Sequence, residues 1–110
     1  MEIIRTKPYQ KAIKRIGATA ENEEKLFDEL SKNPEKGDLI VGSGGVRKIR
    51  MPLGNRGKSA GARVVYCYFA IRERLYLFTA YAKNEKENLT KAEINQLKQI
   101  VDLIKKEMEK

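Results

Sequence analysis

The sequence contains no histidine and only one cysteine, and these two shortages exclude several kinds of chemistry. Without an imidazole there can be no Ser-His-Asp or Cys-His catalysis, no histidine zinc site and no nuclease that exchanges protons between two histidines. The single thiol, Cys67, lies inside an apolar run, which favours a buried structural role over a nucleophilic one. Any phosphate chemistry must therefore use lysine, arginine, tyrosine or a carboxylate.

Long apolar runs are also absent. No stretch approaches the ~20 apolar residues that cross a bilayer, and the N-terminal MEIIRTKPYQ has no signal-peptide core. A chain of 110 residues can bury one core but not two. We therefore expect a single domain over residues 1–110, located in the cytoplasm and without membrane association.

What the chain does have is positive charge gathered in one stretch. The formal net charge is +8, and residues 42–74 alone hold eight basic residues and one acidic residue, Glu73. The segment 19–38 is acidic, with seven acids and three bases. A concentrated basic stretch is typical of a surface that binds a polyanion. Its basic residues are Arg47, Lys48, Arg50, Arg56, Lys58, Arg63, Arg72 and Arg74.

Three β-strands are predicted from this basic stretch onward. Residues 46–51 alternate, which places Lys48 and Arg50 on one face of the strand and Arg47 on the other. Residues 62–69 and 75–82 are rich in β-branched and aromatic residues, and a short turn joins them as an antiparallel hairpin. The two runs are almost continuously apolar, which indicates central strands that are covered on much of both faces.

Helices are predicted before and after these strands. A short strand at residues 2–5 precedes a helix from Thr6 to Gly17, and a second helix runs from Thr19 to Asn33. A capping box at Thr90 opens the last helix. This order predicts an α+β fold with two N-terminal helices, a small antiparallel sheet of three to four strands and a C-terminal helix, the helices packing on one side of the sheet.

The strongest site candidates are the cations Lys48, Arg50 and Arg63. Lys48 and Arg50 project from the same face roughly 6–7 Å apart, and Arg63 on the next strand is expected beside them. Three like charges on one face repel each other unless an anion binds there. Phosphate binding is favoured over ordinary surface ion pairs, because Glu73 is the only acid in residues 42–74, although the helices can supply others.

The remaining candidates follow from weaker patterns. The loop between residues 53 and 61 is glycine-rich and basic, and it does not match a P-loop. The loop residues Arg56 and Lys58 fit either contact with an RNA backbone or simple exposure to solvent. The strand residue Tyr81 fits either stacking on a base or a place in the hydrophobic core. The candidates for RNA binding are Arg47, Arg56, Lys58 and Tyr81, and the candidates for a second cationic wall after the last strand are Lys83 and Lys86.

Three segments also carry a family resemblance. They are GDLIVGSGGVRKIRMPL at residues 37–53, GARVVYCY at 61–68 and RLYLFTAYAKNEKENLTKAE at 74–93. In their order and spacing they resemble the RelE/HigB toxins of bacterial type II toxin–antitoxin systems, within the RelE/ParE superfamily. The Gly-Gly before RKIR and the YAKNEKENL segment are most similar to the HigB-type branch.

This resemblance implies a concrete activity. RelE-like toxins are metal-independent endoribonucleases without a cofactor, which enter the ribosomal A site, cut the mRNA there and inhibit translation. They are neutralised by a cognate antitoxin, which in HigB-like systems usually carries a helix-turn-helix domain, as in HigA. The implied partners are therefore an antitoxin, the ribosome and mRNA.

The resemblance also implies which residues are catalytic. The basic sheet residues of the family correspond to Lys48, Arg50 and Arg63, and its basic residues after the last strand fall near Lys83 and Lys86. Some RelE members use a tyrosine after that strand, and this chain has no tyrosine there.

These residues suggest attack of the ribose 2′-hydroxyl on the scissile phosphate. Lys48, the lysine among these cations, is the predicted base. Arg50 and Arg63 clamp the phosphate, and Lys83 or Lys86 assists the leaving 5′-oxygen.

Three alternatives share the same sequence features. A ParE-like toxin would act on DNA gyrase without cutting RNA, although such a protein has no need of a phosphate clamp on its sheet. A non-catalytic RNA-binding module would use the basic face only to hold the backbone. An inactive or solitary relative would have no antitoxin.

Overall fold

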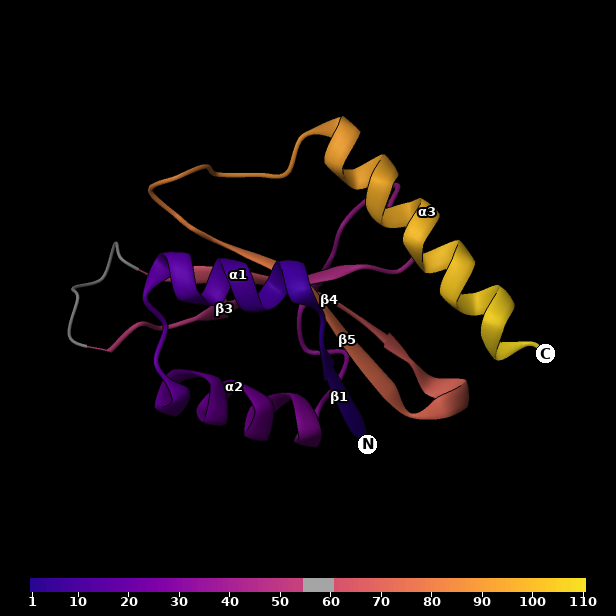
Figure 1. The fold of residues 1–110 in the computed structure, drawn as a ribbon, viewed down its shortest axis with the longest axis horizontal. Coiled ribbons are helices and arrows are strands. Elements are labelled where there is room, and N and C mark those ends of the chain that lie inside the picture. Colours follow the sequence, from indigo (N-terminus) through magenta and orange to yellow (C-terminus); the bar gives the residue numbers. More distant parts are fainter. Residues whose placement is uncertain (55–60) are drawn as a thin grey trace.

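In a computed structural model, which describes residues 1–54 and 61–110, the chain folds into a five-stranded sheet and three α-helices (Figure 1). A short 3-10 turn at Ala70–Arg72 connects the last two strands. The elements in chain order are β1 (Glu2–Arg5), α1 (Lys7–Ile16), α2 (Ala20–Lys32), β2 (Asp38–Leu39), β3 (Arg47–Met51), β4 (Ala62–Phe69), β5 (Arg74–Ala82) and α3 (Lys91–Met108).

The strand order in the sheet is β1-β5-β4-β3-β2. All neighbouring pairs are antiparallel except β1 and β5, which run parallel with Ile3 opposite Leu75. The predicted α+β class is confirmed, but the sheet has one strand more than expected and is not purely antiparallel. The first strand in the sequence, β1, thus pairs with the last, β5. Strand β1 has only four residues, and nothing in so short a segment indicates a partner that is so distant in sequence.

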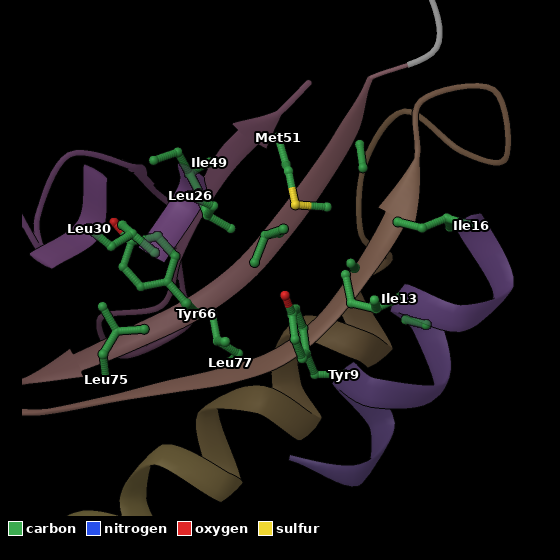
Figure 2. Close-up of a cluster of buried hydrophobic side chains, with 14 residues drawn as sticks. Tyr9, Ile13, Ile16, Leu26, Leu30, Ile49, Met51, Tyr66, Leu75 and Leu77 are labelled. Atoms are coloured by element: carbon green, nitrogen blue, oxygen red, sulfur yellow. The ribbon is translucent and has the colours of Figure 1, made fainter. Parts of the chain in front are cut away.

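One face of the sheet packs against α1 and α2. Their apolar side chains meet the inward residues of the central strands, and Figure 2 shows Tyr9 and Leu30 lying against this face near Tyr66 and Leu77. All four of these side chains are completely buried. Burial of this kind contributes on the order of 25 cal/mol per Å² of apolar surface, so this cluster is a major source of stability.

The opposite face packs against α3, which corrects the expectation that all helices lie on one side. On β4, Val64 and Tyr66 belong to the cluster under α1 and α2, whereas Val65 and Cys67 belong to the cluster under α3. The side chains of a strand point alternately to the two faces of the sheet, and β4 carries apolar residues on both of them. A sheet that is apolar on both faces needs a cover on each.

The helix ends follow their predicted caps. Thr6 accepts a hydrogen bond from the Tyr9 N–H at the start of α1, and Gly17 ends that helix with a φ of 74°. Thr19 and Thr90 each take part in a capping box, at the start of α2 and α3. Among the described residues, no helix is long and apolar enough to span a membrane.

Candidate functional site

A depression of about 550 Å³ opens at the end of the sheet where β3 and β4 meet the segment that follows β5. Its lining mixes three cations with acids and amides. The lining residues are Asp38, Lys48, Arg63, Lys83, Asn84, Glu87 and Asn88. Three of the five side chains predicted to be catalytic, Lys48, Arg63 and Lys83, therefore lie around one hollow.

The strand register brings these three cations together. Lys48 on β3 lies opposite Val65 on β4, and Arg63 is two residues before Val65 on the same face. The backbone N–H of Lys83 donates to the carbonyl oxygen of Gly61 at 3.2 Å, which places the end of β5 beside the start of β4. Cations that are far apart in sequence thus converge because β3, β4 and β5 are neighbours in the sheet.

Arg63 has the electrostatic feature that best indicates a ligand. Its Nη1 is buried and is the one buried side-chain nitrogen or oxygen without a hydrogen-bond partner among residues 1–54 and 61–110. A buried guanidinium nitrogen without an acceptor is costly, and a bound anion would satisfy it.

The other two cations also make no close contact with a carboxylate in the described part of the chain. Within the described part of the chain, Lys48, Arg63 and Lys83 take part in no ion pair. The Lys48 ammonium instead donates to the neutral amide Oδ1 of Asn88 at 3.3 Å. The depression therefore keeps its cations available for an anionic ligand.

Four lining residues were missed by the sequence reasoning. Asp38 lies directly opposite Lys48 in the register between β2 and β3, and Asn84, Glu87 and Asn88 come from the segment after β5. Strand β2 has only two residues, which is too short for an alternation signal. The distance of Asn88 from Lys48 in sequence, 40 residues, hides their contact from any local pattern.

Arg50 and Lys86 do not line this depression. Arg50 lies opposite Arg63 in the register, but its side chain lines a separate hollow of about 290 Å³ beside Lys25 and Glu29 of α2. Lys86 forms an ion pair with Glu93 at 2.6 Å. The structure thus separates these two side chains from the other three predicted catalytic residues.

Of the residues nominated for RNA binding, Arg47 and Tyr81 do not line this depression. Arg47 alternates to the opposite face from Lys48, and its Nη1 donates to the carbonyl oxygens of Glu35 and Gly37 at 3.0 and 2.7 Å. This arrangement gives Arg47 a structural role in holding the segment before β2. Arg56 and Lys58 lie outside the described residues.

Tyr81 needs a correction. It is only 2% exposed, so its ring offers no free face on which a base could stack. Burial raises the pKa of its hydroxyl, against the opposing effect of the positive charges of Arg63 and Lys86. Strand β5 carries apolar residues on both of its faces around Tyr81. Tyr81 is therefore part of the hydrophobic core and not a surface for base stacking.

The described residues contain no group of three or more histidine, cysteine, aspartate or glutamate side chains that could hold a metal ion. Cys67 is buried as expected, its thiol donates to the Gly45 carbonyl oxygen at 3.4 Å, and burial raises the pKa of that thiol to about 11.

Comparison with known proteins places the chain in a family. The family described as "RelE toxin of RelE / RelB toxin-antitoxin system" matches the chain over residues 1–110. The chain belongs to the RelE toxin family. Membership in this family makes it the toxin of a toxin–antitoxin system and implies an antitoxin as its partner.

A solved structure of a RelE toxin shows the same fold. The chain is similar to the E. coli toxin RelE, an arginine-to-alanine double mutant in the free state, with a TM-score of 0.53 and 16% sequence identity. The similarity covers 78% of this chain and 86% of the E. coli chain. At that identity the likeness supports the shared RelE fold, while the residues of the site must be argued from this chain's own geometry.

Proposed function

We propose that this RelE-family toxin is a ribosome-dependent endoribonuclease that cuts mRNA in the A site and so inhibits translation. The single observation that carries this proposal is the depression around Lys48, Arg63 and Lys83, with the unpartnered Nη1 of Arg63. A group of cations without carboxylate partners, at the mouth of a hollow, suits a phosphodiester. Family membership supports the same conclusion.

Arg63 is the proposed phosphate clamp. A guanidinium has five N–H donors in a fixed plane, and it can pair with two phosphate oxygens at once. Because its Nη1 has no hydrogen-bond partner in the described part of the chain, a bond from it to the extra negative charge of a pentacoordinate transition state would replace no existing bond of that atom. Lys83, held beside Arg63 by its backbone bond to Gly61, would add a second positive charge.

The proposed reaction is an internal transfer. The neutral amine form of Lys48 takes the proton of the 2′-hydroxyl, the 2′-oxygen bonds to phosphorus, and the bond from phosphorus to the 5′-oxygen breaks. The 5′-oxygen takes up a proton from Lys83, which leaves a 2′,3′-cyclic phosphate and a 5′-hydroxyl end. The bond from Lys48 to Asn88 would hold the base in place, and the ribosome would supply the in-line alignment that an open depression cannot provide.

Primer extension on a translated message tests this proposal. We expect cuts within A-site codons when the toxin is incubated with translating ribosomes, and far fewer cuts on the same RNA without ribosomes. The Lys48→Ala/Arg63→Ala double variant should not cut. If that variant still arrests translation at the wild-type level, the assignment of this depression is wrong.

The same assay distinguishes the other candidate functions. Growth arrest without new RNA ends, together with gyrase-linked DNA breaks, would indicate a ParE-like toxin. RNA binding without cleavage or toxicity would indicate a binding module. For the partner, we propose a cognate antitoxin, with a HigA-like helix-turn-helix domain as the specific prediction and co-purification with the neighbouring gene product as its test.

A further inference from the structure

The segment between β5 and α3 carries four of the seven residues that line the depression, yet it has no helix or strand of its own. In Figure 1 it forms the long orange arc between the end of β5 and the start of α3. Its lining residues come in two pairs, Lys83 with Asn84 and Glu87 with Asn88. The two residues between these pairs, Glu85 and Lys86, point to other partners.

Lys86 ties this segment to α3. Its ammonium lies 2.6 Å from Oε2 of Glu93 and 5.6 Å from the centre of the Tyr81 ring. The other oxygen of Glu93, Oε1, accepts the Thr90 N–H at 2.8 Å in the capping box of α3. One carboxylate therefore joins the first turn of α3 to Lys86, and the hydrogen bond from Lys86 lowers the pKa of Glu93.

Tyr81 connects the same group to the phosphate clamp. It lies opposite Arg63 in the register between β4 and β5, and its hydroxyl donates to the Glu87 carbonyl oxygen at 3.5 Å. The buried ring of Tyr81 thus lies under the Lys86 ammonium on one side and next to β4, the strand that carries Arg63, on the other. On the far side of the segment, Glu85 pairs with Arg15 of α1 at 3.1 Å.

We propose that Lys86, through its ion pair with Glu93 over the Tyr81 ring, is a positioning residue that holds Lys83 and Asn88 at the site, and not a catalytic residue. This inference rests on the proposed nuclease function for its kinetic test, but its structural test is independent. It assigns Lys86 and Glu93 to one unit and makes the first turn of α3 a part of the site.

Three single variants separate positioning from direct contact with RNA. Lys86→Gln removes the ion pair and one positive charge, and Lys86→Arg keeps the pair. Glu93→Gln removes the ion pair but keeps an oxygen that can accept the capping hydrogen bond of α3. It also removes one negative charge, so the net charge of the protein rises by one. If Lys86 contacts RNA directly, freeing its ammonium by Glu93→Gln should preserve or raise activity.

We expect the opposite result. In single-turnover cleavage on ribosomes, Lys86→Gln and Glu93→Gln should each lower the maximal rate about 10- to 100-fold, because a misplaced Lys83 loses alignment. The half-saturating ribosome concentration should stay close to wild type, Lys86→Arg should retain activity, and the double variant should be no worse than either single variant. Lys106→Gln removes an exposed lysine in the last turn of α3, away from the site, and serves as the charge-matched control, with wild-type kinetics.

Amide hydrogen exchange tests the positioning directly. Glu93→Gln and Lys86→Gln should raise exchange in residues 83–89, while β4 and β5 stay protected as in the wild type. Unchanged exchange in residues 83–89, or a Glu93→Gln variant that cuts at the wild-type rate, overturns the inference. If the wild-type protein does not cut RNA at all, the proposed function fails, and the exchange experiment still decides whether the pair holds the segment.

Discussion

The two faces of the sheet differ in how completely they are covered. Beneath α1 and α2, the apolar residues of both helices close the face, with Tyr9 and Leu30 completely buried (Figure 2). Beneath α3, the helix covers Val65 and Cys67, but a hollow of about 450 Å³ remains between α3 and β5, and the cationic depression opens at the same face.

This difference shows how one set of strands serves two purposes. On β3, Ile49 and Met51 are buried under the helices, while Lys48, in the other phase, faces the depression. Side chains of one strand alternate between the faces, so a well-packed face can hold a strand rigidly while its other face presents charge. The packed face provides the rigidity, and the open face presents the charged side chains on which the proposed cleavage depends.

The largest expected effect compares two arginines on opposite faces. Arg63→Ala should lower the single-turnover cleavage rate by about 10²–10³-fold with little loss of thermal stability, because it removes the donor that the proposed mechanism places at the transition state. Arg47→Ala should cleave like the wild type but unfold more easily, by about 1–3 kcal/mol, because two backbone carbonyls lose their donor. Cleavage assays and urea denaturation of both variants check this contrast, which equal losses of activity would contradict.

A pair of leucines tests how differently the two faces are packed. Leu30→Ala, under α2, should cost about 3–5 kcal/mol of unfolding free energy, and Leu97→Ala, on α3, about 2 kcal/mol, because the α3 side can collapse into its neighbouring hollow. Urea denaturation measures both values. A larger loss for Leu97→Ala would mean that the α3 face is the better packed of the two.

A pair of tyrosines on β4 gives a smaller effect. The Tyr66 hydroxyl accepts the buried N–H of Gly37 at 2.9 Å, just before β2, so Tyr66→Phe should cost about 1–3 kcal/mol by leaving that N–H without a partner. Tyr68→Phe, two residues along the same strand, is the matched control and should change stability very little. Thermal unfolding of the two variants checks the difference, and similar losses would argue against the role of the Gly37 bond.

The smallest expected effect is the pH dependence of the tether to α1. The Glu85 carboxylate accepts the Ala82 N–H at 2.9 Å and pairs with Arg15, and these contacts lower the pKa of Glu85 in the folded protein. A carboxyl with a lowered folded pKa contributes stability that is fully present above its unfolded value of about 4.3 and is lost as the pH falls through the folded value. Glu85→Gln should therefore unfold at a slightly lower temperature than the wild type at pH 7 and at the same temperature in acid. A constant difference at all pH values would contradict this explanation.

Much of the fold was predictable from local patterns. Thr6, Thr19 and Thr90 cap their helices as expected, and the alternation along residues 46–51 correctly separates Lys48 from Arg47. Helix caps and strand alternation depend on residues within a few positions of each other, which is why sequence reasoning finds them. The parallel pairing of β1 with β5 and the placement of α3 on the second face depend on distant contacts, and no local pattern indicated them.

The candidate site divides in the same way. Lys48 and Arg63 were predictable from charge and strand phase, and Lys83 from its charge and its place after the last strand. The burial of Tyr81, the pairing of Lys86 with Glu93 and the contact of Asn88 with Lys48 were not predictable. Charge and period are properties of the chain itself, so the amino-acid sequence alone determined that one strand face would be cationic. Which of those cations meet at one depression and which are bound by a carboxylate was decided only by the tertiary structure, because the direction of a long side chain depends on neighbours supplied by remote parts of the chain.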